Sequence, residues 1–300
     1  MSEVHIRLFN RATGELESEV VFEQWFMDFF YGTRLGLFIT ETVLKRPFLS
    51  EFFGRKRHTR QSTQTIATFI EEHAVNTDEI LDPLDSFESF NAFFIRKLKP
   101  GSRPIAPDPN ALISPADGRL LHFPIENEAV IPVKGASFSI PEILADSSLA
   151  ERFHGGDCII IRLAPADYHR FIYIDSGKHS GHRSIVGALH SVSPYAIWQG
   201  LKIFTENQRQ LCVLDTELFG TVAHIDVGAM LVGRMVQEHP RESAFNRADE
   251  KGYFEFGGST IVLLFEPGRI AIDQDIREYS ARGIESVVKC GSQIGTQKES

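Results

Sequence analysis

The fold of this chain is decided by the stretch Phe254-Glu255-Phe256-Gly257-Gly258-Ser259-Thr260-Ile261-Val262-Leu263-Leu264-Phe265. Its second half is an uninterrupted apolar run, which is typical of a buried core strand. The two glycines before it permit backbone conformations that are closed to other residues. Strain held there by a rigid strand can bring the Ser259 hydroxyl onto the carbonyl carbon of Gly258. Attack gives an ester in place of the peptide bond, and elimination followed by hydrolysis leaves a pyruvoyl group at the new amino terminus.

Two other interpretations of Gly257-Gly258-Ser259-Thr260 need no such chemistry. A glycine pair beside a strand is more often a bulge or a tight turn. A glycine-rich loop can also cradle a phosphate, but that arrangement needs the amino terminus of a helix, and the residues after Ser259 predict a strand. These four residues alone therefore leave the function open.

The sequence on either side of Arg103 differs in character. Beyond it, short β-type runs recur with turn residues between them, which favours a strand-rich domain over alternating βαβ units. These runs are Cys158–Leu163, Phe171–Ile174, Leu211–Leu214, Thr221–Val232 and Thr260–Phe265. We predict an α+β chain with two regions, a mainly helical, membrane-associating region over residues 1–103 and a β-rich catalytic domain over residues 104–300.

The amino-terminal region has its own pattern. Residues 4 to 22 predict an extended segment with a turn at Ala12-Thr13-Gly14, and two or three helices follow up to about Leu81. Asp85 can cap a further helix, with Glu88 placed for a capping box. The apolar residues of that helix fall on one face at spacings of three and four, namely Phe87, Phe90, Phe94 and Leu98.

Composition and charge restrict the function further. The chain has 300 residues with ordinary globular composition, and its net charge of −9 argues against general nucleic-acid binding. Its three cysteines are far apart and form no Cys-x-x-Cys, so a disulfide framework or a cysteine zinc site is not expected. A reducing compartment is the natural inference.

The stretch from Phe22 to Arg60 reverses the overall charge. It holds seven Lys or Arg against four Asp or Glu, together with many large aromatic and aliphatic residues. Such a mixture suits the surface of an anionic bilayer, although the same apolar residues can instead pack on the protein's own core. Asp28, Arg34 and Glu41 interrupt the longest apolar run, so no membrane span is predicted, and the polar opening predicts no signal peptide.

Five motifs, in order along the chain, resemble those of the phosphatidylserine decarboxylase family. The resemblance covers most of the length and is nearest to chlamydial members. The motifs are Phe9-Asn10-Arg11-Ala12-Thr13-Gly14, Ser89-Phe90-Asn91-Ala92-Phe93-Phe94-Ile95-Arg96-Lys97-Leu98-Lys99-Pro100-Gly101-Ser102-Arg103-Pro104-Ile105, Ser114-Pro115-Ala116-Asp117-Gly118, Leu163-Ala164-Pro165-Ala166-Asp167-Tyr168-His169-Arg170 and Phe256-Gly257-Gly258-Ser259-Thr260.

This resemblance implies specific roles. Ser259 is expected to attack the bond after Gly258, which gives a β chain of residues 1–258 and an α chain of residues 259–300. Ser259 then becomes the pyruvoyl cofactor, and no external metal or nucleotide is required. Asp117 resembles the family's charge-relay aspartate, although Asp-Gly alone is more often a plain turn. His169 is expected to protonate the substrate, because a histidine titrates in the right range.

One departure from the family affects the base that assists self-cleavage. Many members have a second histidine, in a Tyr-His-Arg-x-His pattern, where this chain has Ile172. We hypothesise that His190, in Leu189-His190-Ser191-Val192, supplies an imidazole from an adjacent strand instead. If it does not, His169 serves both steps, or cleavage needs only backbone strain and Asp117.

The remaining histidines have simpler interpretations. His179 and His182 lie in a polar stretch with no carboxylate or cysteine beside them in the sequence, which predicts a solvated loop and no metal site. His224 lies on an alternating strand and is expected to be an ordinary, partly buried histidine.

The family implies decarboxylation of phosphatidylserine to phosphatidylethanolamine by an enzyme on the cytoplasmic face of the cell membrane. The pyruvoyl carbonyl acts there as the electron sink. Expected partners are the lipid substrate, an anionic membrane surface, the β and α chains of one precursor and a second copy in a homodimer. Two alternatives stay open: a pyruvoyl decarboxylase of a soluble amino acid, and an uncleaved, non-catalytic lipid-binding relative.

Overall fold

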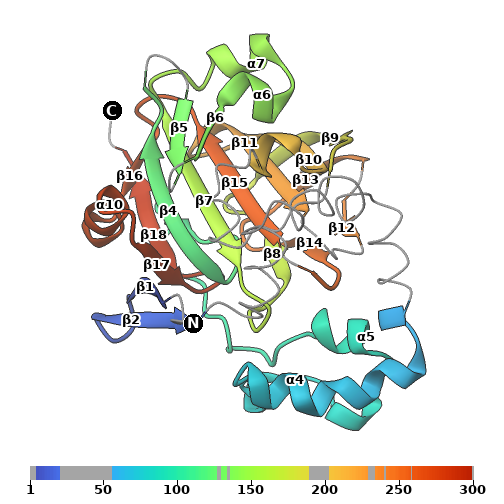
Figure 1. Cartoon of the computed structure of the whole chain (residues 1–300). Coiled ribbons are helices and arrows are strands. Elements are labelled where there is room, and N and C mark those ends of the chain that lie inside the picture. The colour runs from blue at the N-terminus through green and yellow to red at the C-terminus, as the bar shows by residue number, and fades with distance from the viewer. Residues whose placement is uncertain are drawn as a thin grey trace, which may run out of the picture.

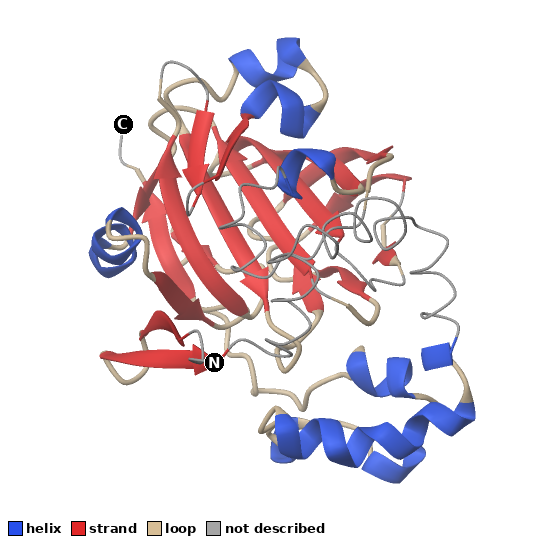
Figure 2. Cartoon of the chain, viewed as in Figure 1, coloured by secondary structure: helices blue, strands red, loops and turns tan. Residues whose placement is uncertain are grey.

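A computed structural model of the chain describes residues 5–20, 56–126, 130–133, 136–188, 203–228, 234–239, 241–257 and 259–298. Strands dominate these residues, and the helices are short (Figures 1 and 2). The chain is therefore α+β, as the sequence predicts. The aromatic and basic residues from Phe22 to Arg55 lie outside the described residues, so the membrane-associating helices expected there stay a prediction.

A ten-stranded sheet forms the centre of the described structure (Figure 1). All its neighbouring strands pair antiparallel except β1 and β17, which are parallel. In spatial order the strands are β13 (Arg241–Phe245), β9 (Gly177–Ile185), β10 (Arg209–Thr216), β11 (Gly220–Gly228), β15 (Ser259–Phe265), β7 (Asp157–Leu163), β4 (Gly118–Pro124), β17 (Glu285–Val288), β1 (His5–Asn10) and β2 (Glu15–Val20).

Smaller elements surround this sheet. The strands form three further sheets: β12 (Met235–Gln237), β14 (Glu250–Phe254) and β8 (Arg170–Ile172); β16 (Ile270–Ile272), β18 (Gln293–Gln297) and β3 (Ala111–Ile113); and β5 (Val130–Val133) with β6 (Ala136–Ser139). The helices are η2 (Arg60–Thr65), α4 (Ile66–Glu72), η3 (Thr77–Glu79), η4 (Leu84–Ser86), α5 (Phe90–Phe94), α6 (Ile140–Leu144), α7 (Ser147–Glu151), α9 (Ile203–Glu206) and α10 (Gln274–Ala281).

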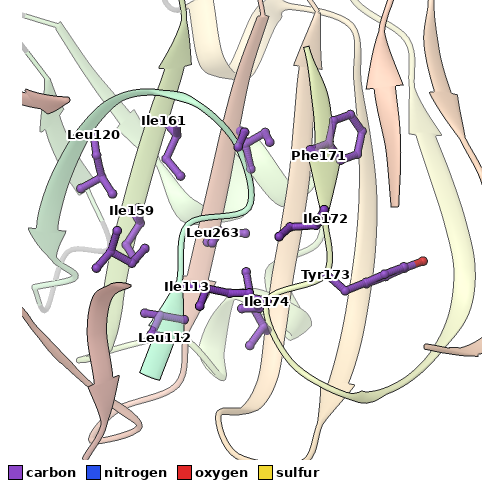
Figure 3. Packing of buried hydrophobic residues seen from close by; sticks show 14 of the residues in the cluster. Leu112, Ile113, Leu120, Ile159, Ile161, Phe171, Ile172, Tyr173, Ile174 and Leu263 are labelled. Carbon is purple, nitrogen blue, oxygen red and sulfur yellow. The ribbon is translucent and has the colours of Figure 1, made fainter. Parts of the chain in front are cut away.

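Strand β15 lies in the middle of the sheet and is buried on both faces. Val262 and Leu264 belong to an apolar cluster that includes residues of α6, α7 and α9. Ile261, Leu263 and Phe265 belong to a second cluster, covered by residues of β8, β14, β3 and β18 (Figure 3). Because successive side chains of a strand point to opposite faces, burial on both sides requires a continuous apolar run. The apolar run of β15 therefore decides the fold.

The described part of the amino-terminal region divides in two. Strands β1 and β2 form a hairpin with a turn at Arg11–Gly14 and extend the main sheet next to β17. Residues 56–99 instead form a helical lobe below the sheet (Figure 1), with its own apolar cluster that includes Ile66, Phe69 and Phe93. The predicted extended segment with a turn is confirmed, and it forms this hairpin, whereas the boundary near residue 103 stays a prediction.

One helix start differs from the prediction. The helix expected from Asp85 is only α5, and its cap is Ser89, whose Oγ accepts the backbone N–H of Ala92 at 3.1 Å. Asp85 lies instead in the 3-10 turn η4. The predicted helix start at Asp85 is therefore four residues too early. Serine caps helices as well as aspartate does, so the sequence pattern alone does not distinguish the two positions. Among the described residues, none forms a helix that is long and apolar enough to span a membrane.

Candidate active site

Ser259 is the first residue of β15 and is completely buried. It pairs on one side with Leu163 of β7 and on the other with Gly228 of β11, a residue without a side chain. Just before it, Gly257 adopts a φ of 143°, which residues with a Cβ rarely adopt. Gly258 lies outside the described residues. The serine is thus held rigidly in the sheet directly after a turn that requires glycine.

His169 faces this serine. It lies in the connection between β7 and β8, is completely buried, and its Nδ1 is 3.4 Å from Ser259 Oγ. Its own carbonyl accepts the N–H of Phe254 at 2.9 Å, which ties the histidine loop to β14. Its Nε2 has no hydrogen-bond partner among the described residues. The Nδ1 atom of the imidazole is therefore directed at Ser259, and its Nε2 atom is available to a bound substrate.

The surroundings of His169 keep its imidazole neutral. Burial lowers its pKa from the ordinary 6.5 to about 4, and the Arg96 guanidinium acts in the same direction, against the opposite effect of Asp167. Burial alone would raise the pKa of Asp167, but Arg119 and the Ala164 N–H outweigh it and lower that pKa. At neutral pH, His169 is therefore a proton acceptor beside Ser259.

Helix α5 holds both loops of the site. Phe94 stacks on the imidazole of His169 with ring centroids 4.0 Å apart, and it also meets Phe256 edge-on at 5.1 Å. The side-chain oxygen of Asn91 accepts the backbone N–H of Phe256 at 3.0 Å. Phe256 lies three residues before Ser259, so α5 fixes the chain on the approach to the glycine pair as well as the histidine.

Arg96 strengthens the same connection. Its side chain is buried, and its Nη2 donates to the carbonyls of Ala166 at 3.0 Å and Asp167 at 3.5 Å, just before His169. Burial lowers its pKa to about 10, so it stays charged at neutral pH. A cation buried against carbonyl oxygens orients the loop and also disfavours a second positive charge on the imidazole.

Asp117 is completely buried and lies between basic groups and the carboxy-terminal segment. Its two oxygens accept hydrogen bonds from the Arg103 guanidinium at 2.7 to 3.0 Å, from Lys289 Nζ at 3.3 Å and from the Cys290 N–H at 2.8 Å. Among the described residues, no histidine donates to it. The carboxylate is buried and fully engaged, so it fixes Arg103 and the carboxy-terminal segment to its own loop.

Ile172, where the family resemblance leads us to expect a second histidine, is an apolar residue. Ile172 is buried within the cluster on the Ser259 face of the sheet, where its side chain points toward the strand of Leu263 (Figure 3). Its N–H donates to the Pro115 carbonyl at 2.9 Å, so it lies beside the loop of Asp117. His190, its hypothesised replacement, lies outside the described residues.

The interpretation of His179 and His182 as a solvated loop is wrong. Both lie on β9, His179 is buried and His182 is half-buried. Cys212 of β10 lies beside them, although nothing near them in the sequence suggested a cysteine. His224 is completely buried and hydrogen-bonds Asp226 at 2.9 Å, so it is more buried than expected. Strand pairing explains why His179 and His182 meet Cys212, because it joins residues that are distant along the chain.

Three side chains of the site have roles that the sequence pattern does not predict. Asn91, Phe94 and Arg96 hold the two loops, whereas the apolar spacing of this segment predicts only one helix face, which includes Phe94. A signal is present in the sequence, because Asn91 stands between the phenylalanines of a buried helix and Arg96 follows two residues after that helix. Buried polar residues usually have a specific partner.

The chain is similar to known proteins over nearly its whole length. Residues 90–296 match the family model described as phosphatidylserine decarboxylase. Proteins named phosphatidylserine decarboxylase proenzyme are 40% identical in Fusobacterium nucleatum, over 98% of both chains, and 40% identical in Clostridium novyi, over 97% of this chain and 99% of the relative. The relative of that name from Chlamydia muridarum is 41% identical over 95% of both chains.

The depressed pKa of His169 predicts how stability depends on pH. The unfolded chain takes up this proton near pH 6.5 and the folded chain only near pH 4, so the contribution to folding is complete above 6.5 and is lost as pH falls to 4. The loss is roughly 3 kcal/mol. In a Ser259→Ala background, His169→Gln should flatten the fall of the melting temperature over this window.

The exposed His154 provides the control for that measurement. His154→Gln in the same background should keep the steep fall of the parent. Parallel melting curves for His169→Gln and the parent between pH 6.5 and 4 contradict the assigned electrostatics.

Proposed function

This chain belongs to the phosphatidylserine decarboxylase family, and we propose that it cleaves itself between Gly258 and Ser259 and converts Ser259 into a pyruvoyl group. The reaction of the mature enzyme is the decarboxylation of phosphatidylserine to phosphatidylethanolamine. The proposal for its chemistry rests on one observation, the 3.4 Å approach of Ser259 Oγ to His169 Nδ1 with both residues fully buried.

Self-cleavage begins with the transfer of the Ser259 hydroxyl proton to His169 Nδ1. The oxygen forms a bond to the carbonyl carbon of Gly258 as the C–N bond breaks, and the nitrogen of residue 259 takes up a proton. Loss of the α-proton of residue 259 then expels the Gly258 carboxylate from the β-carbon. Water finally replaces the nitrogen, which leaves as ammonia. The products are a β chain that ends at Gly258 and an α chain that begins with the pyruvoyl group.

The surroundings of Ser259 favour this sequence of steps. A serine hydroxyl is a poor nucleophile until a base removes its proton, and a neutral imidazole at hydrogen-bonding range is such a base. The contacts of α5 with Phe256 and His169 hold the base and the approach to the glycine pair in register, so little conformational freedom is lost on reaction. Burial also keeps bulk water from the ester.

The site fits a pyruvoyl group at position 259. Gly228, which pairs with residue 259, has no side chain, and the buried Nε2 of His169 is a polar atom without a hydrogen-bond partner among the described residues. Such a group supplies a carbonyl that condenses with the substrate amine and accepts the electrons released with carbon dioxide. His169 delivers the proton to the substrate α-carbon. To donate this proton near neutral pH, His169 needs a pKa above its value of about 4. A negatively charged lipid headgroup beside the imidazole raises the pKa in that direction.

For the second histidine of the family, we retain His190 as the proposed replacement in this chain. The alternative is that His169 serves both steps, because it already contacts Ser259. We propose that Asp117 acts indirectly. Its salt bridge to Arg103 and its bond to the Cys290 N–H support the loop that meets Ile172 through Pro115. A carboxylate with several donors already bound has little capacity to orient an imidazole as well.

The proposed site of action is the surface of an anionic membrane on its cytoplasmic side. Support comes from the basic and aromatic stretch that ends at Arg60, since such a composition binds acidic bilayers, and from the lipid nature of the substrate. The helical lobe that follows this stretch contacts the active-site loops through α5. Membrane attachment would thus bring the substrate to the side of the molecule where these loops lie.

Vesicles test the substrate and the location together. Purified protein is incubated with phosphatidylserine vesicles, or with free serine and neutral vesicles, and both carbon dioxide release and pelleting are measured. We expect release only with the lipid, no release from Ser259→Ala, and pelleting that is stronger with anionic vesicles and weaker at high salt.

Comparable release from free serine contradicts the lipid substrate and favours a soluble amino acid. Complete recovery of an active enzyme in the supernatant contradicts the membrane location and leaves the chemistry intact.

Rates of chain cleavage test the roles within the site. His169→Gln removes the base and should slow cleavage by about 100-fold or more. Asn91→Ala removes one hydrogen bond to Phe256 and should slow it by about 5-fold, the equivalent of roughly 1 kcal/mol. The control is Asn246→Ala, an asparagine in a turn away from these loops. Gels of samples taken during expression or refolding provide the rates.

His190→Ala belongs to the same series. Wild-type cleavage in this variant excludes the replacement of the second histidine by His190, whereas undiminished cleavage in His169→Gln would falsify the assignment of the base.

A further inference from the structure

Strands β9 and β10 bring two histidines and a cysteine together away from Ser259. The donor atoms of His179, His182 and Cys212 all lie within 4.8 Å of one another. Cys212 lies directly opposite His182 in the antiparallel ladder. The sheet order is β9, β10, β11 and β15, so this group is separated from the strand of Ser259 by β11.

A β-bulge creates this grouping. Residues three apart on a regular strand point to opposite faces, so His179 and His182 would be separated by the sheet. The register shifts here: three steps along β9, from His179 to His182, match only two along β10, from Leu214 to Cys212. Gly181, inside the bulge, has a φ of 107°. The extra residue turns both imidazoles to the side of Cys212, an arrangement that often has a function.

The imidazoles have unused nitrogens. Neither ring nitrogen of His182 has a hydrogen-bond partner among the described residues, although both atoms are buried, and the same holds for Nδ1 of His224 and of His239. The rings of His179 and His182 are 5.1 Å apart. Each buried polar atom without a partner costs about 1–3 kcal/mol, so several in one place indicate that something else binds there.

The local charge permits a cation. Lys251 is completely buried nearby, but its ammonium group is already bound by Asp226 Oδ2 and Gln237 Oε1, both at 2.9 Å. Asp226 therefore compensates Lys251. A divalent ion bound to a Cys212 thiolate adds a net charge of only +1, which neutral imidazoles accommodate. The thiol proton is released when the bond to the metal forms.

We propose that His182, Cys212 and His179 bind a zinc ion that links β9 to β10. Imidazole and thiolate are donors that Zn²⁺ prefers, whereas Mg²⁺ and Ca²⁺ prefer oxygen. Zinc bonds of about 2.0 to 2.3 Å place tetrahedral donors about 3.3 to 3.8 Å apart, so a spread of 4.8 Å needs only small side-chain rotations. The metal is structural, because its ligands lie away from the reacting serine.

His182 and Cys212 are the anchoring ligands. His179 already uses both nitrogens: Nδ1 accepts the Gly181 N–H at 3.0 Å, and Nε2 meets the Tyr173 hydroxyl at 3.1 Å. It joins the metal by giving up one of these contacts. The fourth position is left for water or for His239, whose ring lies 5.9 Å from that of Tyr173.

Cobalt provides a direct test that does not depend on enzymatic activity. Full-length protein freed of metal with a chelator is titrated with Co²⁺ and then with Zn²⁺. We expect a thiolate-to-cobalt charge-transfer band, the visible absorption of tetrahedral cobalt, and loss of both as zinc displaces it. Zinc should also raise the melting temperature.

Matched variants identify the ligands. Cys212→Ser should abolish the charge-transfer band, whereas Cys158→Ser, which changes a buried cysteine in the apolar cluster on the opposite face, should retain it. His182→Gln should weaken zinc binding by more than the about 10- to 100-fold that second-shell changes cause. Circular dichroism of each metal-free variant verifies that it is folded.

Absence of a thiolate band in the wild-type protein overturns the proposal whatever the variants do. A band that persists in folded Cys212→Ser, or equal zinc affinity in wild type and His182→Gln, overturns the assigned ligands. All of these outcomes are independent of self-cleavage, so failure of the metal site leaves the proposed function untouched.

Discussion

The rest of this structure depends on one constraint: the hydroxyl of Ser259 and the imidazole of His169 are held together in the buried interior, out of contact with solvent. Ser259 Oγ and His169 Nδ1 are 3.4 Å apart, and neither residue is exposed. Burial makes the imidazole neutral, which is the form that accepts a proton. Two neighbouring strands hold the serine, so its position does not relax away from the base. A central strand buried on both faces is what makes such rigidity possible.

The short helix α5 connects this centre with the helical lobe. It stacks Phe94 on the histidine and binds the backbone before the glycine pair through Asn91. Arg96, two residues beyond the helix, fixes the loop that precedes His169. Two loops far apart in the sequence thus depend on one turn and a half of helix. A movement of the lobe at a membrane surface would reach the reacting atoms through these contacts.

The sequence could predict those features that depend on local pattern. The apolar run of β15, the amino-terminal hairpin and the run that forms β7 were visible from the residues alone, and the family motifs pointed to Ser259 and His169. Contacts that depend on strand register could not be predicted. The bulge that joins His179 to Cys212 and the salt bridge between Asp117 and Arg103 link residues by pairing and packing, which leave no periodic signal. The cap at Ser89 was missed because Asp85 offered an equally good pattern.

The covalent state of residue 259 decides whether the chain matures into a pyruvoyl enzyme, and intact mass spectrometry with a carbonyl-specific label measures that state directly. We predict two chains from freshly purified protein, of which the smaller spans residues 259–300 and gains the mass of one amine after reductive amination. Its amino terminus should resist Edman sequencing. A single unbroken chain of 300 residues, or a small chain that begins with an unmodified serine, contradicts the account.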